Sequence, residues 1–180
     1  IPTIPIEVDM GSGNDGVSYG GSSTVTINAG SGDDYIEIVG TGSATVDAGS
    51  GNDFIIHNVQ NGIAGSAVIN GGSGIDKIIG GISTDKIYGD EGDDDISGPA
   101  KRIDAGSGAD LVTFEMEDQL IDSHISLGGN SSDQLDLWGT VGNDQVMIEE
   151  KGAQLGVGFG DYELTIDGVK VFKLYGSLKL

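Results

Sequence analysis

The sequence predicts an all-β fold, a parallel β-solenoid whose coils are about 18–19 residues long. Three observations support this prediction. The chain has 33 glycines among 180 residues, yet 37% of its residues are hydrophobic, which favours many tight turns joined by short buried strands over disorder. A nine-residue segment recurs in phase along the chain. The aliphatic residues around that segment follow no helical spacing.

The recurring segment is a turn rich in glycine and aspartate. Six copies align without gaps and a seventh is degenerate; they begin at Met10, Ala29, Ala48, Gly71, Gly89, Ala105 and Gly128. The sixth residue of every copy is an aspartate, and these are Asp15, Asp34, Asp53, Asp76, Asp94, Asp110 and Asp133. Their spacings of 19, 19, 23, 18, 16 and 23 residues suit a coil of two short strands and two turns.

Aliphatic residues flank each turn at fixed distances. One follows the aspartate by two residues, at Val17, Ile36, Ile55, Ile78, Ile96, Val112 and Leu135. Another precedes it by seven, at Val8, Ile27, Val46, Ile69, Ile87 and Ile103, whereas the seventh copy has Ser126 there. We expect these aliphatic residues to point inward from strands whose other residues point outward, and to be buried only when coils stack. We assign residues 1–136 to the solenoid and residues 137–180 to degenerate coils or a β cap.

The composition of the turns predicts a site for a hard cation. Glycine recurs at the second and fourth positions, where it permits a positive φ and turns backbone carbonyls into the turn; these are Gly11, Gly13, Gly30, Gly32, Gly49, Gly51, Gly72, Gly74, Gly92, Gly106 and Gly108. The aspartate adds a carboxylate, and stacking repeats the same oxygens one coil further along. Calcium takes six to eight such oxygens in flexible geometry, whereas magnesium requires a stricter octahedron. Zinc is disfavoured because only His57 and His124 offer nitrogen.

The turns resemble the RTX (repeats-in-toxin, or hemolysin-type) calcium-binding nonapeptide G-G-x-G-x-D-x-U-x, in which U is a large aliphatic residue. Gly71–Ile79 and Gly89–Ser97 match it best, and Gly80–Tyr88, with Asp85, is a copy between them on the opposite turn. The resemblance covers residues 8–136 and implies a right-handed β-roll or β-solenoid with calcium between like turns of adjacent coils. It implies about five ions, in the pairs Asp15/Asp34, Asp34/Asp53, Asp53/Asp76, Asp76/Asp94 and Asp94/Asp110. Asp85 and Asp133 would raise the number to about six or seven.

The net charge and the absence of membrane-spanning and signal-like segments in the sequence limit the functions to be considered. With 8 basic and 29 acidic residues the net charge is −21, which argues against a nucleic-acid partner. No apolar run is long enough to span a membrane, and the first residues have no signal-peptide layout, which favours a segment of a longer chain. The resemblance implies a calcium-dependent structural module, such as a stalk, spacer, adhesive or filament-forming segment, of a large secreted or cell-surface bacterial protein. Its expected partners are calcium ions, neighbouring domains and other copies of itself.

Two other functions remain open at the level of sequence. A polysaccharide-binding accessory module would need an aromatic row, and an ice-binding solenoid would need a regular row of Thr or Asn. An enzyme is not expected, because the acidic runs contain no catalytic base or nucleophile.

Two further rows of polar residues accompany the turns. Asn14, Asp33, Asn52 and Asp93 are expected to face solvent, and Asp9, Asn28, Asp47, Asn70 and Asp104 to form an outward ladder or complete the metal shell.

Overall fold

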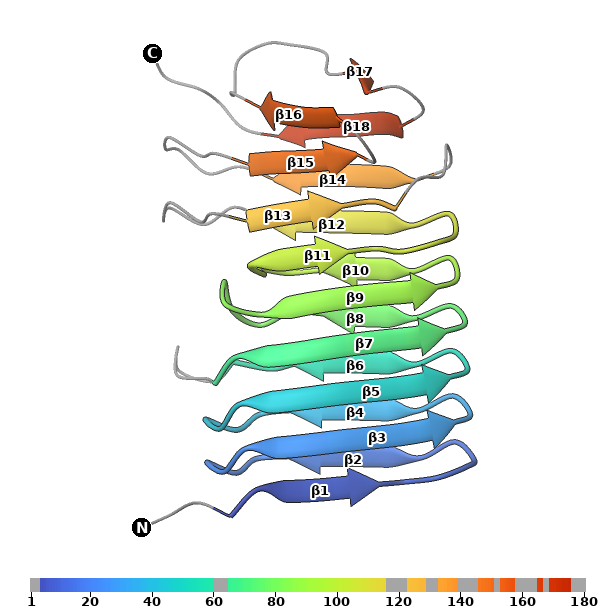
Figure 1. Ribbon diagram of the computed structural model, residues 1–180, viewed down its shortest axis with the longest axis vertical. Coiled ribbons are helices and arrows are strands. Elements are labelled where there is room, and N and C mark those ends of the chain that lie inside the picture. Colours follow the sequence, from blue (N-terminus) through green and yellow to red (C-terminus); the bar gives the residue numbers. More distant parts are fainter. Residues whose placement is uncertain are drawn as a thin grey trace.

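The chain folds into a parallel β-solenoid in which each coil contributes one strand to each of two facing sheets (Figure 1). This computed structural model describes residues 4–59, 65–115, 123–128, 133–138, 146–150, 153–157, 165–166 and 169–175; only the backbone is described for 114–115, 123, 137–138 and the last four ranges. The fold class predicted from the repeat is confirmed. Among the described residues no helix is long and apolar enough to cross a membrane.

In the described part of the chain both sheets have nine strands, and up to β15 successive strands alternate between the two sheets. The first contains β1 (Ile6–Asp9), β3 (Val25–Ser31), β5 (Ala44–Ser50), β7 (Ala67–Ser73), β9 (Lys86–Glu91), β11 (Arg102–Asp104), β13 (Ser123–Ser126), β15 (Val146–Glu150) and β16 (Ala153–Val157). The second contains β2 (Gly16–Tyr19), β4 (Tyr35–Ile38), β6 (Phe54–His57), β8 (Lys77–Ile79), β10 (Asp95–Ser97), β12 (Leu111–Glu115), β14 (Gln134–Trp138), β18 (Val169–Tyr175) and β17 (Thr165–Ile166).

The core lies between the sheets and consists of two columns of aliphatic side chains. The predicted residues stack in register from coil to coil, and most are fully buried. One column is Ile27, Val46, Ile69, Ile87, Ile103 and Ile125, and the other is Ile36, Ile55, Ile78, Ile96, Val112 and Leu135. Burial of each large side chain stabilises the fold by about 1.5–3 kcal/mol. The columns fix the register, because a slip by one residue would turn them outward.

The seventh copy is displaced by one residue from the alignment made on the sequence. Ile125 pairs with Ile103 and is fully buried, whereas Ser126 pairs with Asp104. Gly128 has φ +91° and lies against the carbonyl oxygen of Gly106, so it occupies the second position of the turn and not the first. The prediction that this copy begins at Gly128 is therefore wrong by one residue, and the additional residue lies between Gly128 and Asp133.

The strands after Trp138 extend both sheets. β15 pairs in parallel with β13, and β18 pairs in parallel with β14. The last strand of each sheet runs the other way, because β16 pairs antiparallel with β15 and β17 pairs antiparallel with β18. The parallel coil pattern therefore gives way to antiparallel pairs at this end of the described chain.

Candidate metal centre

The glycine- and aspartate-rich turns stack along one side of the solenoid, where strands of the first sheet pass into the second (Figure 1). The glycines predicted at the second and fourth positions all have positive φ, between 94° and 144°. At Gly51, where φ is +130°, a β-carbon would also collide with the carbonyl oxygen of Gly32 in the preceding coil. Glycine is therefore required both by the backbone conformation and by the close approach of successive turns.

The sixth-position aspartates form a ladder along this row of turns. The Oδ1 atom of each aspartate from Asp34 onward accepts a hydrogen bond from the backbone N–H of the aspartate one coil earlier. The N···O distances are 2.7 Å for Asp15 to Asp34, 2.7 Å for Asp34 to Asp53, 2.9 Å for Asp53 to Asp76, 2.9 Å for Asp76 to Asp94, 3.0 Å for Asp94 to Asp110 and 3.2 Å for Asp110 to Asp133. The structure thus brings all seven predicted aspartates into one continuous row.

The second oxygen of these carboxylates has a different environment. The Oδ2 atoms of Asp15, Asp34, Asp53, Asp76, Asp94 and Asp110 are buried and have no hydrogen-bond partner. The side chains of this row from Asp34 onward are nearly inaccessible, with at most 3% of each residue exposed. A buried carboxylate oxygen without a partner is costly, because the charged group has lost its water without replacement. Its regular recurrence indicates that a positive ligand fits there.

Backbone oxygens share the space into which Oδ2 points. A β-carbon added at Gly71 would collide with Oδ2 of Asp76 and would lie 2.9 Å from the carbonyl oxygen of Gly89. At Gly89 the corresponding atoms are Oδ2 of Asp94 and the carbonyl oxygen of Ala105. A carboxylate oxygen of one coil and a carbonyl oxygen of the next therefore face the same small volume, as a hard cation between coils would require.

Burial raises the pKa of several aspartates in the row. The pKa is about 6 for Asp76, about 7 for Asp94 and about 6 for Asp110, and it is also raised for Asp53. Loss of hydration is the largest cause in each case, and neighbouring carboxylates add to it, while the backbone hydrogen bond to Oδ1 acts in the opposite direction. Without a cation these carboxylates therefore ionise at a higher pH than an exposed aspartate, and Asp94, whose pKa is about 7, is ionised in only about half of the molecules at neutral pH.

The fifth-position side chains form a second ladder on the exposed side of the turns. Asn14 Oδ1 accepts from the N–H of Asp33 at 3.0 Å, and Asp33 Oδ1 accepts from the N–H of Asn52 at 2.9 Å. In the same way, Asn52 Oδ1 accepts a hydrogen bond from the N–H of Ile75, and Asp93 Oδ1 accepts one from the N–H of Ala109. These residues are exposed, as expected, but they also tie successive turns together. The row Asp9, Asn28, Asp47 and Asn70 lies on the outer face of the first sheet in register from strand to strand, and Tyr88 on β9 stands between Asn70 and Asp104.

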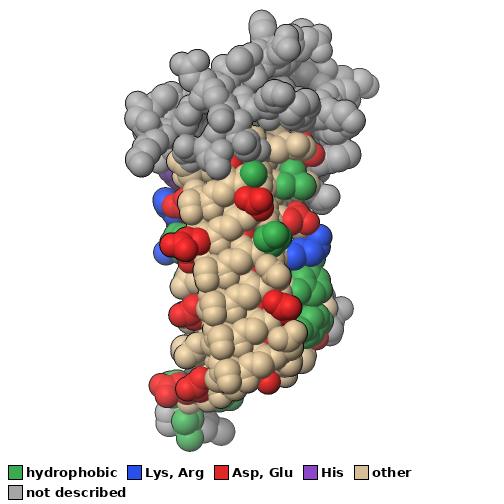
Figure 2. Space-filling view, turned by 90° about the vertical axis from the view of Figure 1, so that its right-hand side faces the viewer, with side chains coloured by type: hydrophobic (Ala, Val, Ile, Leu, Met, Phe, Trp, Pro, Cys, Tyr) green, Lys and Arg blue, Asp and Glu red, His purple; other side chains and the backbone are tan. Residues whose placement is uncertain are grey.

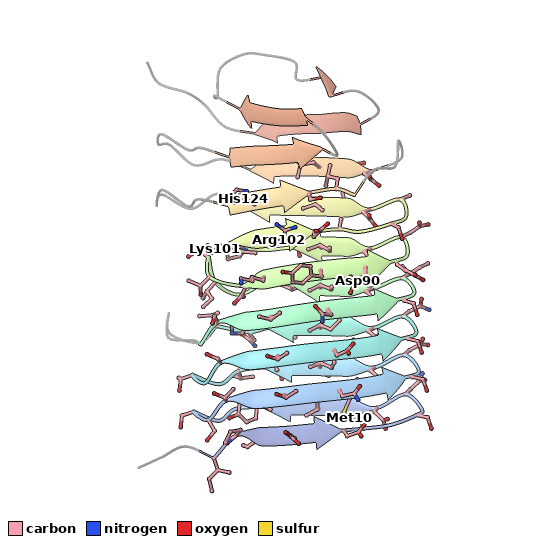
Figure 3. All side chains as sticks on the ribbon, in the orientation of Figure 1. Met10, Asp90, Lys101, Arg102 and His124 are labelled. Carbon is pink, nitrogen blue, oxygen red and sulfur yellow. The ribbon has the colours of Figure 1, made fainter. Side chains whose placement is uncertain are left out.

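Asp90 and Ile75 depart from the pattern of the turns. Asp90 takes the second position of its copy with φ +72° and is the one non-glycine residue with positive φ among those described; it lies where β9 enters the turn (Figure 3). Ile75 takes a fifth position, where its side chain cannot accept a hydrogen bond, and 60% of it is exposed. Both positions are strained or unsatisfied relative to their counterparts in other coils.

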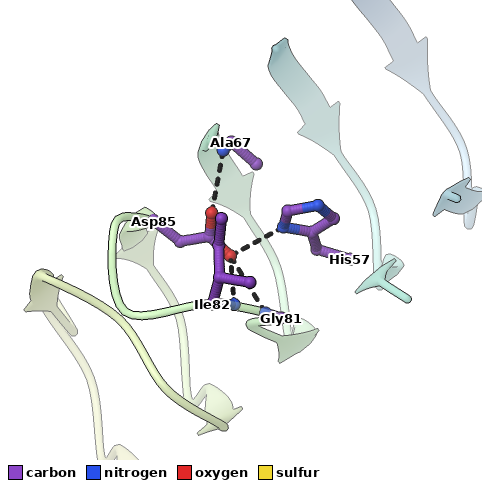
Figure 4. Close-up of polar contacts among 5 residues, drawn as sticks. All are labelled: His57, Ala67, Gly81, Ile82 and Asp85. Carbon is purple, nitrogen blue, oxygen red and sulfur yellow. Dashed lines mark hydrogen bonds and ion pairs between the residues drawn. The ribbon is translucent and has the colours of Figure 1, made fainter. Parts of the chain in front are cut away.

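Asp85 lies in an opposite turn, away from the other predicted ligands, and both of its oxygens are used (Figure 4). Oδ1 accepts from the N–H of Ala67 at 2.8 Å, and Oδ2 accepts from the N–H groups of Gly81 at 2.9 Å and Ile82 at 3.1 Å. The Nδ1 atom of His57 lies 2.7 Å from the same Oδ2, and both side chains are fully buried. Sequence reasoning missed this pair because the two residues are 28 positions apart on different coils. The prediction of Asp85 as a ligand gains no support, and we leave it out of the ligand set.

The turn side of the molecule presents little charge despite the net charge of −21. Figure 2 shows this side as mostly uncharged surface with separate acidic patches, which agrees with the burial of the sixth-position carboxylates. In the described part of the chain no three His, Cys, Asp or Glu side chains gather into one group, so a cation there would take most of its ligands from the backbone.

Comparison of the chain with protein-family models, with curated proteins and with solved structures gives no match. The assignment of the turns therefore depends on their own geometry.

Proposed function

We propose that this chain is a calcium-dependent structural module of the RTX type, which folds and stiffens when calcium binds between successive glycine- and aspartate-rich turns. The observation that carries the proposal is the row of buried Oδ2 atoms without hydrogen-bond partners. Calcium would supply the missing positive charge, and the ligands would be carboxylates of the row together with carbonyl oxygens of neighbouring turns. The pairs Asp15/Asp34, Asp34/Asp53, Asp53/Asp76, Asp76/Asp94 and Asp94/Asp110 offer about five such sites.

The energetics support a folding role for the cation. Extracellular calcium modules bind with Kd of about 10⁻⁴ to 10⁻³ M. At a free concentration of about ten times Kd, each site stabilises the folded state by about 1.4 kcal/mol, and five sites by about 7 kcal/mol. That sum is comparable to the whole stability of a small domain. About ten positive charges would also offset about half of the net charge of −21.

A rod of stacked coils suits a mechanical role. We infer a stalk, spacer, adhesive or filament-forming segment of a secreted or cell-surface protein, because calcium at the required concentration is found outside cells. Since each coil contacts only its neighbours, ions distributed along the row would stiffen the whole rod.

A calcium titration followed by circular dichroism and by calorimetry tests the proposal. We expect β-structure to appear cooperatively with calcium, with about five ions bound, and magnesium at the same concentration to be much less effective. Full β-structure with unchanged thermal stability in excess chelator would contradict the proposal.

Two adjacent aspartates provide a matched pair of variants. Asp34→Asn replaces a buried carboxylate of the row, and it should lower the number of ions bound and raise the calcium concentration needed for folding. Asp33→Asn removes the same charge from the exposed fifth-position ladder, where Asn14 and Asn52 already serve, so calcium binding should be nearly unchanged. Equal effects of the two substitutions would mean that only net charge matters.

A further inference from the structure

An aromatic pair stands on the outer face of the second sheet. Tyr35 on β4 and Phe54 on β6 are in register, with ring centroids 5.6 Å apart and an interplanar angle of 57°. Tyr35 is 43% exposed. Figure 2 shows a group of hydrophobic side chains along its right-hand edge, which is the side of this sheet.

The neighbour of Tyr35 on the other side is a glycine. Gly16 on β2 pairs with Tyr35, and a β-carbon added to Gly16 would meet no atom within 4 Å. Phe54 therefore packs on one side of the tyrosine ring, while the other side faces an open shelf with the backbone of β2 as its floor. The shelf is about one strand spacing wide, or about 4.8 Å, which is close to the width of a single six-membered ring.

A carboxylate that is fixed by two hydrogen bonds lies beside this shelf. Glu37 lies two residues after Tyr35 on β4 and so projects from the same face of the sheet. Its Oε2 accepts from the hydroxyl of Ser18 at 3.0 Å, and its Oε1 accepts from the side-chain amide of Asn58 at 3.1 Å. A carboxylate has about four lone-pair positions, so about two remain for further donors. The hydroxyl of Ser18 also keeps its acceptor capacity.

We propose that Gly16, Ser18, Tyr35 and Glu37 form a binding subsite for one ring of a neutral glycan. The C–H face of a pyranose would lie on the electron-rich face of the tyrosine ring, and its hydroxyls would donate to Glu37 and Ser18. An aromatic wall beside a fixed polar edge is the composition of a small-molecule site, not of a purely apolar contact. An acidic glycan is disfavoured by the net charge of −21.

The test uses the full chain folded in calcium. Cellohexaose, mannohexaose and xylohexaose are the neutral probes and hexagalacturonate is the acidic one, with binding measured by calorimetry and by chemical shifts of the amides of β2 and β4. We expect at least one neutral probe to bind and to shift Ser18 and Glu37, with little response to the acidic probe. Tyr35→Ala should weaken binding about tenfold, the value expected for loss of one aromatic contact.

Two further variants separate the subsite from general effects of substitution. Gly16→Thr fills the shelf on an open strand position that a β-branched residue tolerates, so it should abolish binding without loss of folding. Leu111→Ala alters the same outward column of the sheet three strands beyond Phe54 and should bind as the unmodified chain does. The proposal is overturned if no neutral probe binds at millimolar concentration, or if all three variants bind equally. It is also overturned if Tyr35→Ala changes sedimentation and leaves glycan binding intact, because the face would then be a contact between copies.

Discussion

At the scale of single residues, the two oxygens of each aspartate from Asp34 to Asp110 in the row have different environments. Oδ1 of Asp94 completes the hydrogen bonding of the backbone at Asp76, and its Oδ2 is buried without a partner. The sequence was sufficient to identify the aspartates and the positive-φ glycines, because both recur at fixed positions of the repeated turn. It was not sufficient to identify the hydrogen-bond partner of either oxygen, which depends on the direction in which coils stack.

Asp90 offers a stabilising substitution. An aspartate at φ +72° is less favourable than glycine, and the carboxylates of Asp104, Asp47 and Glu91 further oppose its ionisation by raising its pKa, after the larger effect of burial. Asp90→Gly should therefore raise the free energy of unfolding in calcium by about 1 kcal/mol, measured by urea denaturation. Gly51→Ala is the reverse control and should destabilise the fold. A loss of stability in Asp90→Gly would show that the carboxylate makes a favourable contact of its own.

Ile75 interrupts the exposed ladder of fifth-position side chains. Ile75→Asn would give the backbone N–H of Asp93 in the next coil an acceptor like those that Asn14 and Asp33 supply. We expect a gain of about 0.5–1.5 kcal/mol in the free energy of unfolding, also from urea denaturation. Ile75→Ala removes the same exposed apolar surface without adding an acceptor and should give no such gain. Equal gains from the two substitutions would assign the effect to solvation and not to the ladder.

At the scale of elements, the turns on the two sides of the solenoid differ: one side has the repeated glycine- and aspartate-rich turns, and the other has turns such as the one in which Asp85 contacts His57. The strands and their register followed from the spacing of aliphatic residues, since only one register buries both columns. The opposite turns vary in length and composition, so their structure could not be predicted from the repeat. The pairing of His57 with Asp85 arises because stacking brings the end of β6 beside the turn before β9, a proximity that sequence spacing does not encode.

Asp85→Asn tests whether the opposite turn is independent of calcium. The amide would place a donor where Oδ2 now accepts from Gly81, Ile82 and His57, at a cost of about 1–3 kcal/mol. The melting temperature should fall by a similar amount at every calcium concentration, with the number of ions bound unchanged. Asp34→Asn should instead weaken the dependence of the melting temperature on calcium. If Asp85→Asn also weakened that dependence, the opposite turn would have to be counted among the cation sites.

At the scale of the whole molecule, the stacked carboxylates make the fold respond to protons and cations in opposite ways. The pKa values of Asp76, Asp94 and Asp110 are raised from 3.8 to about 6, 7 and 6 because burial disfavours the charged form. The folded chain without metal therefore binds more protons than the unfolded chain between pH 4 and 7. Its free energy of unfolding is highest below about pH 4 and falls as the pH rises through this range.

In calcium the sign should reverse, since the cation binds the ionised carboxylates and displaces their protons. In chelator, circular dichroism should show more β-structure at pH 4.5 than at pH 7, and in millimolar calcium urea denaturation should show greater stability at pH 7 than at pH 4.5. Asp94→Asn is the decisive variant, because it removes the group with the highest of these pKa values. It should stabilise the metal-free chain at pH 7 and flatten its pH dependence, yet destabilise the chain in calcium. A metal-free chain that is more stable at pH 7 than at pH 4.5 would contradict the burial of these carboxylates as the source of the coupling, because burial can only favour their protonated form.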